Sequence, residues 1–165
     1  MGTTSQIICY SRTGHSRHLA DQLADTMGGG VHVAATGRYG VPFLGWLSAG
    51  RDALRGHAPP LSGLGDMPDD SDPIVIVGPV WAGQPAAPLN TVADHLRGTG
   101  HRVAAALTCG DKSEDDRPLD ILAERLGQPL VARLMLSNRA AASGQALSRI
   151  KRFAQMCKTG EEWQG

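Results

Sequence analysis

The stretch that decides the fold is Ile7-Ile8-Cys9-Tyr10-Ser11-Arg12-Thr13-Gly14-His15-Ser16. It begins with an apolar run, which is typical of a strand that is buried on both faces. A polar turn around Gly14 follows, and after it comes a segment with apolar residues at helical spacing. The first N–H groups of a helix lack partners, and together with the hydroxyls of Ser11, Thr13 and Ser16 they can bind an anion. The stretch therefore predicts a phosphate-binding turn between a strand and a helix.

Apolar runs alternate with segments of helical periodicity through the rest of the chain, a pattern typical of β-α units around a parallel sheet. Strands are predicted at 7–10, 31–34, 74–77, 102–107 and 130–136, and Gly78-Pro79 is expected to end the third of them. Helices are predicted around 19–27, 43–54, 88–96, 119–126 and 147–157. The chain, 1–165, is therefore expected to form a single α/β domain.

Connections between parallel strands are right-handed, so five such units fit few sheet orders, of which 2-1-3-4-5 is a common one. This order makes a doubly wound, three-layer sandwich. Its ligands bind beyond the carboxyl ends of the strands where the chain reverses direction, here the first and third strands. Three loops are expected to line that crevice, at 11–16, 79–85 and 108–111.

Length and charge limit the classes of partner. The 165 residues are enough for one sizeable core, and 16 Lys and Arg balance 16 Asp and Glu. Nucleic acid and anionic membrane surfaces are therefore not expected as partners. No signal peptide and no apolar run long enough to span a bilayer is recognised, so a cytoplasmic protein is expected. It is expected to be a monomer or a homodimer.

The cysteines and histidines predict neither disulfides nor metal. Cys9, Cys109 and Cys157 form no C-x-x-C pair, which fits a reducing compartment. The six histidines make no H-E-x-x-H motif and no cluster with cysteine, so no metal site is expected. Cys9 falls inside a predicted strand, where its thiol is expected to be buried and unreactive.

The polar turn allows other interpretations. Ser, Thr and Gly cap helices and form turns without any ligand, and only the neighbouring glycine-containing loops favour binding. The lysine of P-loop ATPases and the three glycines of a dinucleotide-binding turn are absent, which favours a terminal monophosphate. A cysteine-dependent phosphatase would need an arginine six positions after Cys9, where His15 stands. A receiver domain would need an acidic residue at the end of the first or third strand.

The residues of two loops resemble those of a known family. Tyr10-Ser11-Arg12-Thr13-Gly14-His15-Ser16 resembles the FMN-phosphate loop of the flavodoxin family. Gly78-Pro79-Val80-Trp81-Ala82-Gly83-Gln84-Pro85 is similar to the loop after the third strand in flavodoxin-like proteins and related FMN reductases. With the succession of strands and helices, the resemblance covers nearly the whole chain and implies a flavodoxin-like fold that binds FMN.

The resemblance also implies which residues bind FMN. The phosphate is expected on Ser11, Arg12, Thr13, Gly14, His15 and Ser16, although Arg12 is free to point into solvent instead. The ring is expected on Pro79, Val80, Trp81, Ala82 and Gly83, and its pyrimidine edge on Thr108, Cys109, Gly110 and Asp111.

Three of these residues have roles of their own to be decided. Trp81 either anchors its loop or lies against the isoalloxazine, and the resemblance favours the second role. The Gly83 peptide is expected to reorient toward flavin N5. Asp111 could instead cap the helix that follows it. No side chain is predicted as a catalytic acid or base, because the flavin carries the chemistry.

Two classes of function stay open at this point. One is an electron carrier that docks to a redox partner protein, which the resemblance implies first. The other is a reductase that takes hydride from NAD(P)H and passes it to a quinone or flavin. Carriers of the family are typically acidic, whereas this chain has a net charge of +0 and no aromatic at 108–111 to cover the outer flavin face. A cofactor-free interaction module is a third reading, which the full set of phosphate donors disfavours.

Overall fold

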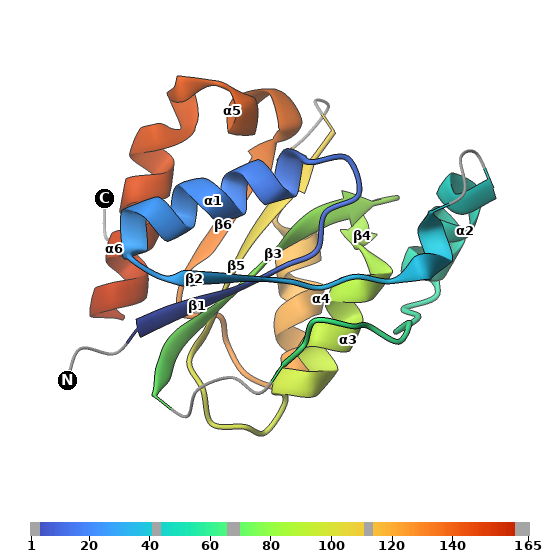
Figure 1. The fold of residues 1–165 in the computed structure, drawn as a ribbon, viewed down its shortest axis with the longest axis horizontal. Helices are drawn as coiled ribbons and strands as arrows, with labels where there is room; N and C mark the ends of the chain where they lie inside the picture. The colour runs from blue at the N-terminus through green and yellow to red at the C-terminus, as the bar shows by residue number, and fades with distance from the viewer. Residues whose placement is uncertain (1–3, 41–43, 66–69, 111–113, 161–165) are drawn as a thin grey trace.

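The computed structural model describes residues 4–40, 44–65, 70–110 and 114–160. Five strands form a parallel sheet in the order β2 (Gly30–Val33), β1 (Thr4–Cys9), β3 (Ser71–Trp81), β5 (Val103–Cys109) and β6 (Arg133–Ser137) (Figure 1). Each neighbouring pair of these five strands is parallel. The sheet order predicted from the sequence, 2-1-3-4-5, is therefore confirmed.

Helices cover both faces of the sheet (Figure 1). On one face lie α1 (His15–Met27), α5 (Asn138–Ala142) and α6 (Leu147–Thr159). On the other lie α3 (Ala87–Leu96) and α4 (Arg117–Leu126). The strands contribute apolar side chains to both faces of the sheet. Ile74 and Ile76 of β3 pack in the core under α3 and α4. Val75 and Val77 point the opposite way, into the core under α1 and α6, as the two-residue period of a strand requires.

Helix α2 (Leu44–Leu54) lies beyond one end of the sheet rather than on a face (Figure 1). It follows a short 3₁₀ turn, η1 (Gly37–Tyr39). The residues it buries are Gly45, Ala49, Asp52 and Ala53. A helix with so little apolar area on its inner side gains little by packing on the sheet. The predicted helix is confirmed, but its larger apolar residues stay out of the core.

Strand β3 is longer than the sequence analysis expected. Gly78-Pro79 does not end it, because pairing with β5 continues to Pro79 and Thr108. Strand β1 pairs with β3 only as far as Val77, so the N–H that Pro79 lacks interrupts no ladder with β1. The strand then turns back into β4 (Gln84–Pro85), which was not predicted.

The carboxyl-terminal part differs in smaller ways. Strand β6 begins at Arg133 rather than near Leu130, since the three residues before it lie outside the strand. Helix α5 and the 3₁₀ turn η2 (Gly144–Ala146) were not predicted, because such short helices carry no full period of apolar residues. None of the helices that the structure describes has the length and apolar character needed to cross a membrane.

Candidate functional site

A cavity of about 470 Å³ lies at the carboxyl ends of β1, β3 and β5. We call it the crevice. Residues from all three predicted loops line it: Arg12, Thr13, His15, Ser16, Pro79, Val80, Trp81, Ala82, Thr108, Cys109 and Gly110. Helix α2 and the start of α5 supply the other walls, with Trp46, Leu47, Ala49, Gly50, Leu54 and Asn138. The topology therefore brings together the loops that the sequence analysis predicted as neighbours.

The polar turn forms one end of the crevice. Gly14 adopts φ 95°, a left-handed conformation that favours glycine, and its N–H donates to Ser11 Oγ over 3.1 Å. Ser11 therefore holds the turn, and neither Ser11 nor Gly14 lines the crevice. Gly14 is the N-cap of α1, and no side chain among the described residues caps this helix. The first N–H groups of α1 are thus available to an anion.

Ser16 links this turn to the sheet. It is buried in the first turn of α1, and its Oγ lies 2.7 Å from Thr108 Oγ1, which is also buried. Hydroxyl groups both donate and accept, so the pair can keep this bond and still offer a lone pair or a proton to a ligand. Arg12 is half-buried, whereas Thr13 and His15 are exposed.

Trp81 also lines the crevice, and two tyrosines hold its ring. Tyr10 meets it edge-on with ring centroids 5.7 Å apart and an interplanar angle of 84°. Tyr39 does so from η1, at 5.1 Å and 79°. Edge-to-face pairs of this kind stabilise aromatic clusters beyond the area they bury. Trp81 is half-buried and lines the crevice, so anchoring its loop and facing a ligand are compatible roles.

The crevice can therefore hold a flat ligand with an anionic end. The polar part of its lining offers helix N–H groups, hydroxyls and the Arg12 guanidinium, and the rest offers apolar and aromatic side chains. Ligand cavities of roughly 300–1,000 Å³ are typical for molecules of cofactor size. The donor set at the polar end fits a phosphate monoester, and the apolar end fits a ring system.

Comparison with known proteins gives matches at the level of structure only. No family model matches the chain, and no curated protein matches it in sequence. A flavoprotein from Lactobacillus acidophilus, solved in complex with FMN, superposes with a TM-score of 0.64 at 18% identity, covering 81% of this chain and 92% of that one. A flavodoxin from Streptococcus pneumoniae gives 0.55 at 16% identity, over 96% of this chain and 99% of that one. The fold is flavodoxin-like. A flavodoxin from Bacillus cereus agrees, with a TM-score of 0.57 at 15% identity, over 94% and 98% of the two chains.

Within this flavodoxin-like fold, the turn between β3 and β4 is a two-residue hairpin. Val80 pairs with Pro85 and Trp81 with Gln84, which leaves Ala82 and Gly83 as the turn. Their φ angles are 51° and 75°, as a hairpin turn of the primed type requires. Ala82 lines the crevice, whereas Gly83 is exposed and stands outside its lining. Gly83 adopts its positive φ without a Cβ to strain it, whereas Ala82 carries the strain.

The third edge of the site differs from the expectation of a loop. Thr108 and Cys109 belong to β5, because they pair with Leu136 and Ser137 of β6. Both are buried, and the Cys109 thiol donates to the carbonyl of Leu136 over 3.5 Å. Gly110 follows the strand and is exposed. Asp111 lies outside the described residues.

Helix α2 is the part of the site that sequence reasoning missed. Trp46, Leu47 and Leu54 line the crevice although more than half of Trp46 and Leu54 is exposed, at 64% each. Their spacing predicted a helix, but a periodic apolar stripe is ordinarily a core-facing stripe. Large exposed apolar side chains beside a cavity indicate a ligand wall, which only the tertiary structure reveals. Asn138 gave no signal in the sequence.

The Cys9 thiol is buried completely, as the sequence analysis predicted. Burial raises its pKa to about 12, against which the nearby Arg17 guanidinium has a smaller, lowering effect. A thiol with this pKa is almost entirely protonated at neutral pH and is a poor nucleophile. In the part of the chain that the structure describes, no group of three His, Cys, Asp or Glu side chains is placed to hold a metal ion.

Proposed function

We propose that the chain binds FMN in the crevice and acts as a flavodoxin-like redox protein that transfers electrons through it. The observation that carries the proposal is that a single cavity joins the uncapped start of α1 to an aromatic and apolar wall. FMN has a dianionic phosphate at one end and a flat, largely apolar ring at the other. The 18%-identical flavoprotein that was solved with FMN supports the choice of ligand.

The phosphate end would rest on this chain's own donors. The N–H groups at the start of α1 and the hydroxyls of Thr13 and Ser16 would donate to phosphate oxygens, and the Arg12 guanidinium lines the same cavity. The helix dipole adds a favourable field for a dianion at the same place.

The ring end would be dry and apolar. Trp81 and Val80 come from β3, and Leu47 from α2 faces the same cavity. Apolar walls exclude water from the ring, which strengthens every electrostatic interaction that the chain makes with it. When bound, FMN supplies one- and two-electron transfer, and the residues of the crevice supply position and electrostatics.

The test is a titration of the purified apoprotein with FMN, riboflavin and FAD, followed by flavin fluorescence. FMN is expected to bind at least about tenfold more tightly than riboflavin, because charge-assisted bonds to the phosphate contribute about 1.5–3 kcal/mol each. Equal affinities for FMN and riboflavin would remove the phosphate assignment. Absence of affinity for all three flavins would remove the proposed function.

A second candidate is a reductase that oxidises NAD(P)H and reduces a quinone or flavin. The observation that favours it is the net charge of +0, since a carrier that docks by long-range steering benefits from a strong field. The reconstituted protein would be mixed anaerobically with NADPH or NADH. Bleaching of the flavin by the nucleotide alone, with turnover on a quinone, would favour the reductase. Bleaching only in the presence of a partner reductase would favour the carrier.

A further inference from the structure

Asp52 is a carboxylate that helix α2 buries, with 4% of the residue exposed. The large apolar residues of the same helix remain 50–67% exposed: Leu44, Trp46, Leu47 and Leu54. This arrangement inverts the usual amphipathic helix, which buries its apolar face and leaves its charges in water. Helix α2 is therefore not held in place by its larger apolar side chains.

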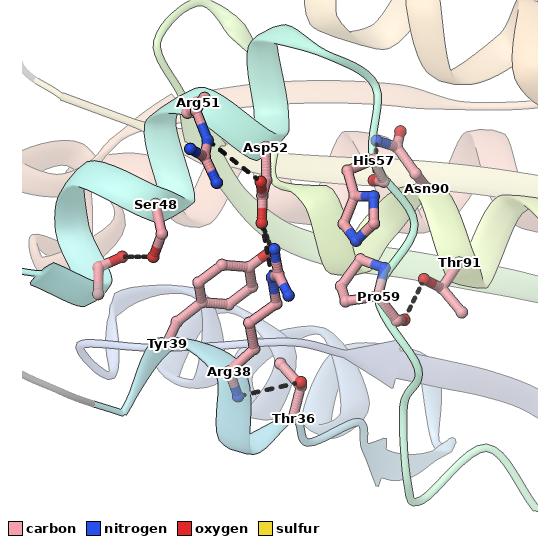
Figure 2. A network of polar contacts seen from close by, with 11 residues as sticks. Thr36, Arg38, Tyr39, Ser48, Arg51, Asp52, His57, Pro59, Asn90 and Thr91 are labelled. Atoms are coloured by element: carbon pink, nitrogen blue, oxygen red, sulfur yellow. Dashed lines mark hydrogen bonds and ion pairs between the residues drawn. The ribbon is translucent and has the colours of Figure 1, made fainter.

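Figure 2 shows Asp52 between Arg38, Tyr39 and Arg51. Arg38 Nε and the Tyr39 hydroxyl both donate to Asp52 Oδ2, over 2.7 Å and 2.9 Å, and Arg51 Nε lies 3.9 Å from Oδ1. The hydrogen bond from Arg38 is the main cause that lowers the pKa of Asp52. Burial raises the pKa of Tyr39 to about 12, and its bond to Asp52 adds to this. Asp52 is thus charged and Tyr39 protonated at neutral pH, which keeps Tyr39 as the donor.

A close approach of two backbones also joins α2 to η1, and we call this contact the seam. A Cβ on Gly45 would lie 2.8 Å from the Tyr39 carbonyl oxygen and 3.1 Å from its carbon. Real Cβ atoms avoid such distances to backbone, so only glycine allows α2 to pack this tightly on Tyr39. The seam therefore combines a close backbone contact with a buried, hydrogen-bonded carboxylate.

Tyr39 connects the seam to Trp81. Tyr39 is 2% exposed, so its ring has no room to turn away from its neighbours. Asp52 holds its hydroxyl, and its ring abuts Trp81 with centroids 5.1 Å apart. Asp52 belongs to α2 and bonds to Tyr39. Each of these connections reaches a residue that lines the crevice, Leu47 through α2 and Trp81 through Tyr39.

We infer that Asp52 is a positioning residue for the ring end of the crevice, holding helix α2 directly and the indole of Trp81 through Tyr39. Its effect on a bound ligand rests on the proposed function, in which the ring of FMN lies at this end. Its effect on Trp81 does not depend on any ligand. The two effects can therefore be measured separately.

The ligand-free experiment uses Trp81 as its own reporter. The sequence has 3 tryptophans, so replacing Trp46 and Trp163 by Phe leaves Trp81 as the single tryptophan, which can be excited at wavelengths that tyrosine does not absorb. In this background, Asp52→Asn and Tyr39→Phe are each expected to raise the acrylamide quenching constant of Trp81 at least about twofold. The matched control is Asp94→Asn, because Asp94 also accepts from an arginine, Arg125, over 2.8 Å, but lies on α3 rather than on α2. It is expected to leave the quenching unchanged.

The second experiment measures flavin affinity in the chain with all its tryptophans. Asp52→Asn is expected to weaken FMN and riboflavin to the same extent, by about fivefold or more, since it acts on the ring end. Tyr39→Phe keeps the ring and removes only the hydroxyl, so it guards against a fold defect in the Asp52 variant. The double variant is expected to be no weaker than Asp52→Asn alone, because both changes break one connection.

Unchanged quenching of Trp81 in both variants overturns the inference, whether or not flavin binds. Raised quenching together with flavin affinities within twofold of the parent protein also overturns it, since Trp81 would then move without consequence for the crevice. Raised quenching in a protein that binds no flavin at all refutes the proposed function and supports the position that Asp52 gives to Trp81.

Discussion

Ser16 and Thr108 are 92 positions apart in the chain and share a buried hydrogen bond of 2.7 Å between their hydroxyl oxygens. The bond joins the first turn of α1 to the carboxyl end of strand β5, beside the crevice. Two of the loops that were expected to line the crevice separately are therefore fastened to each other. A ligand held by one of them is held in a fixed position relative to the other.

Removing one partner of this bond is expected to cost stability. Thr108→Val leaves the buried Ser16 hydroxyl unpaired, which should lower the free energy of unfolding by about 1–3 kcal/mol. Ser16→Ala should have a similar effect. The double variant should lose less than the sum of the two, since no unpaired hydroxyl remains. Urea denaturation of the four apoproteins measures this, and strict additivity would show that the bond contributes nothing.

The phosphate end is tested by Thr13→Ala. Thr13 is exposed, so its loss should leave the unfolding free energy nearly unchanged. Affinity for FMN should fall at least about tenfold, because one charge-assisted bond is worth about 1.5–3 kcal/mol. Riboflavin, which lacks the phosphate, is the internal control and should bind the variant as it binds the parent. A parallel loss for both flavins would place Thr13 at the ring instead.

The ring end is tested by Trp81→Ala and Trp46→Ala. Both side chains line the crevice, but two tyrosine rings hold Trp81 whereas Trp46 is 64% exposed. Trp81→Ala should therefore weaken FMN and riboflavin equally and should also destabilise the apoprotein. Trp46→Ala should weaken both flavins with little change in stability. Isothermal titration and thermal melts report the two quantities, and an FMN-selective loss in either variant would contradict the assignment.

The strained hairpin turn predicts opposite effects at two neighbouring positions. Ala82 has φ 51°, where a residue with a Cβ costs about 1–2 kcal/mol, so Ala82→Gly should stabilise the protein by up to about 1 kcal/mol after the entropy cost of glycine. Gly83→Ala places a Cβ at φ 75° and should destabilise it by about the same amount. Chemical denaturation measures both, with Gly110→Ala as a control at a glycine without a positive φ. Effects of the same sign at Ala82 and Gly83 would contradict the turn geometry.

Stability should fall at alkaline pH because two thiols are buried. Burial is the main cause that raises the pKa of Cys9 and of Cys157 to about 12, from 9.0. The unfolded chain releases these protons above pH 9 while the folded protein keeps them, so the stability that is complete below pH 9 is lost between pH 9 and 12. At pH 10 each thiol should account for a loss of about 1.4 kcal/mol relative to pH 8.

Urea unfolding at pH 8, 9 and 10 measures that loss. The control is Cys157→Ala, which should be less stable than the parent at pH 8 but should lose less on going to pH 10. An equal loss in the parent and in Cys157→Ala would assign the pH dependence to other groups.

Much of the fold could be predicted from local patterns. The run Ile74-Val75-Ile76-Val77 and the helical spacing of Leu19 and Leu23 reflect burial on both faces of a strand and on one face of a helix, which neighbouring residues alone encode. Right-handed crossovers then restrict the sheet to few orders, and the predicted order is the one observed. The continuation of β3 through Pro79 could not be predicted, because it depends on where β1 stops pairing.

The sequence by itself determined the strands of the parallel sheet, the longer helices and the polar turn at 11–16, since each follows from short-range spacing, and the handedness of L-residues restricted the sheet to a few orders. Only the tertiary structure decided that Ser16 bonds to Thr108, that Tyr39 braces Trp81, and that α2 stands beside the crevice rather than on the sheet. These relations join segments distant in the sequence. Their partners are selected by packing and hydrogen-bond geometry in space, which residue spacing along the chain does not record.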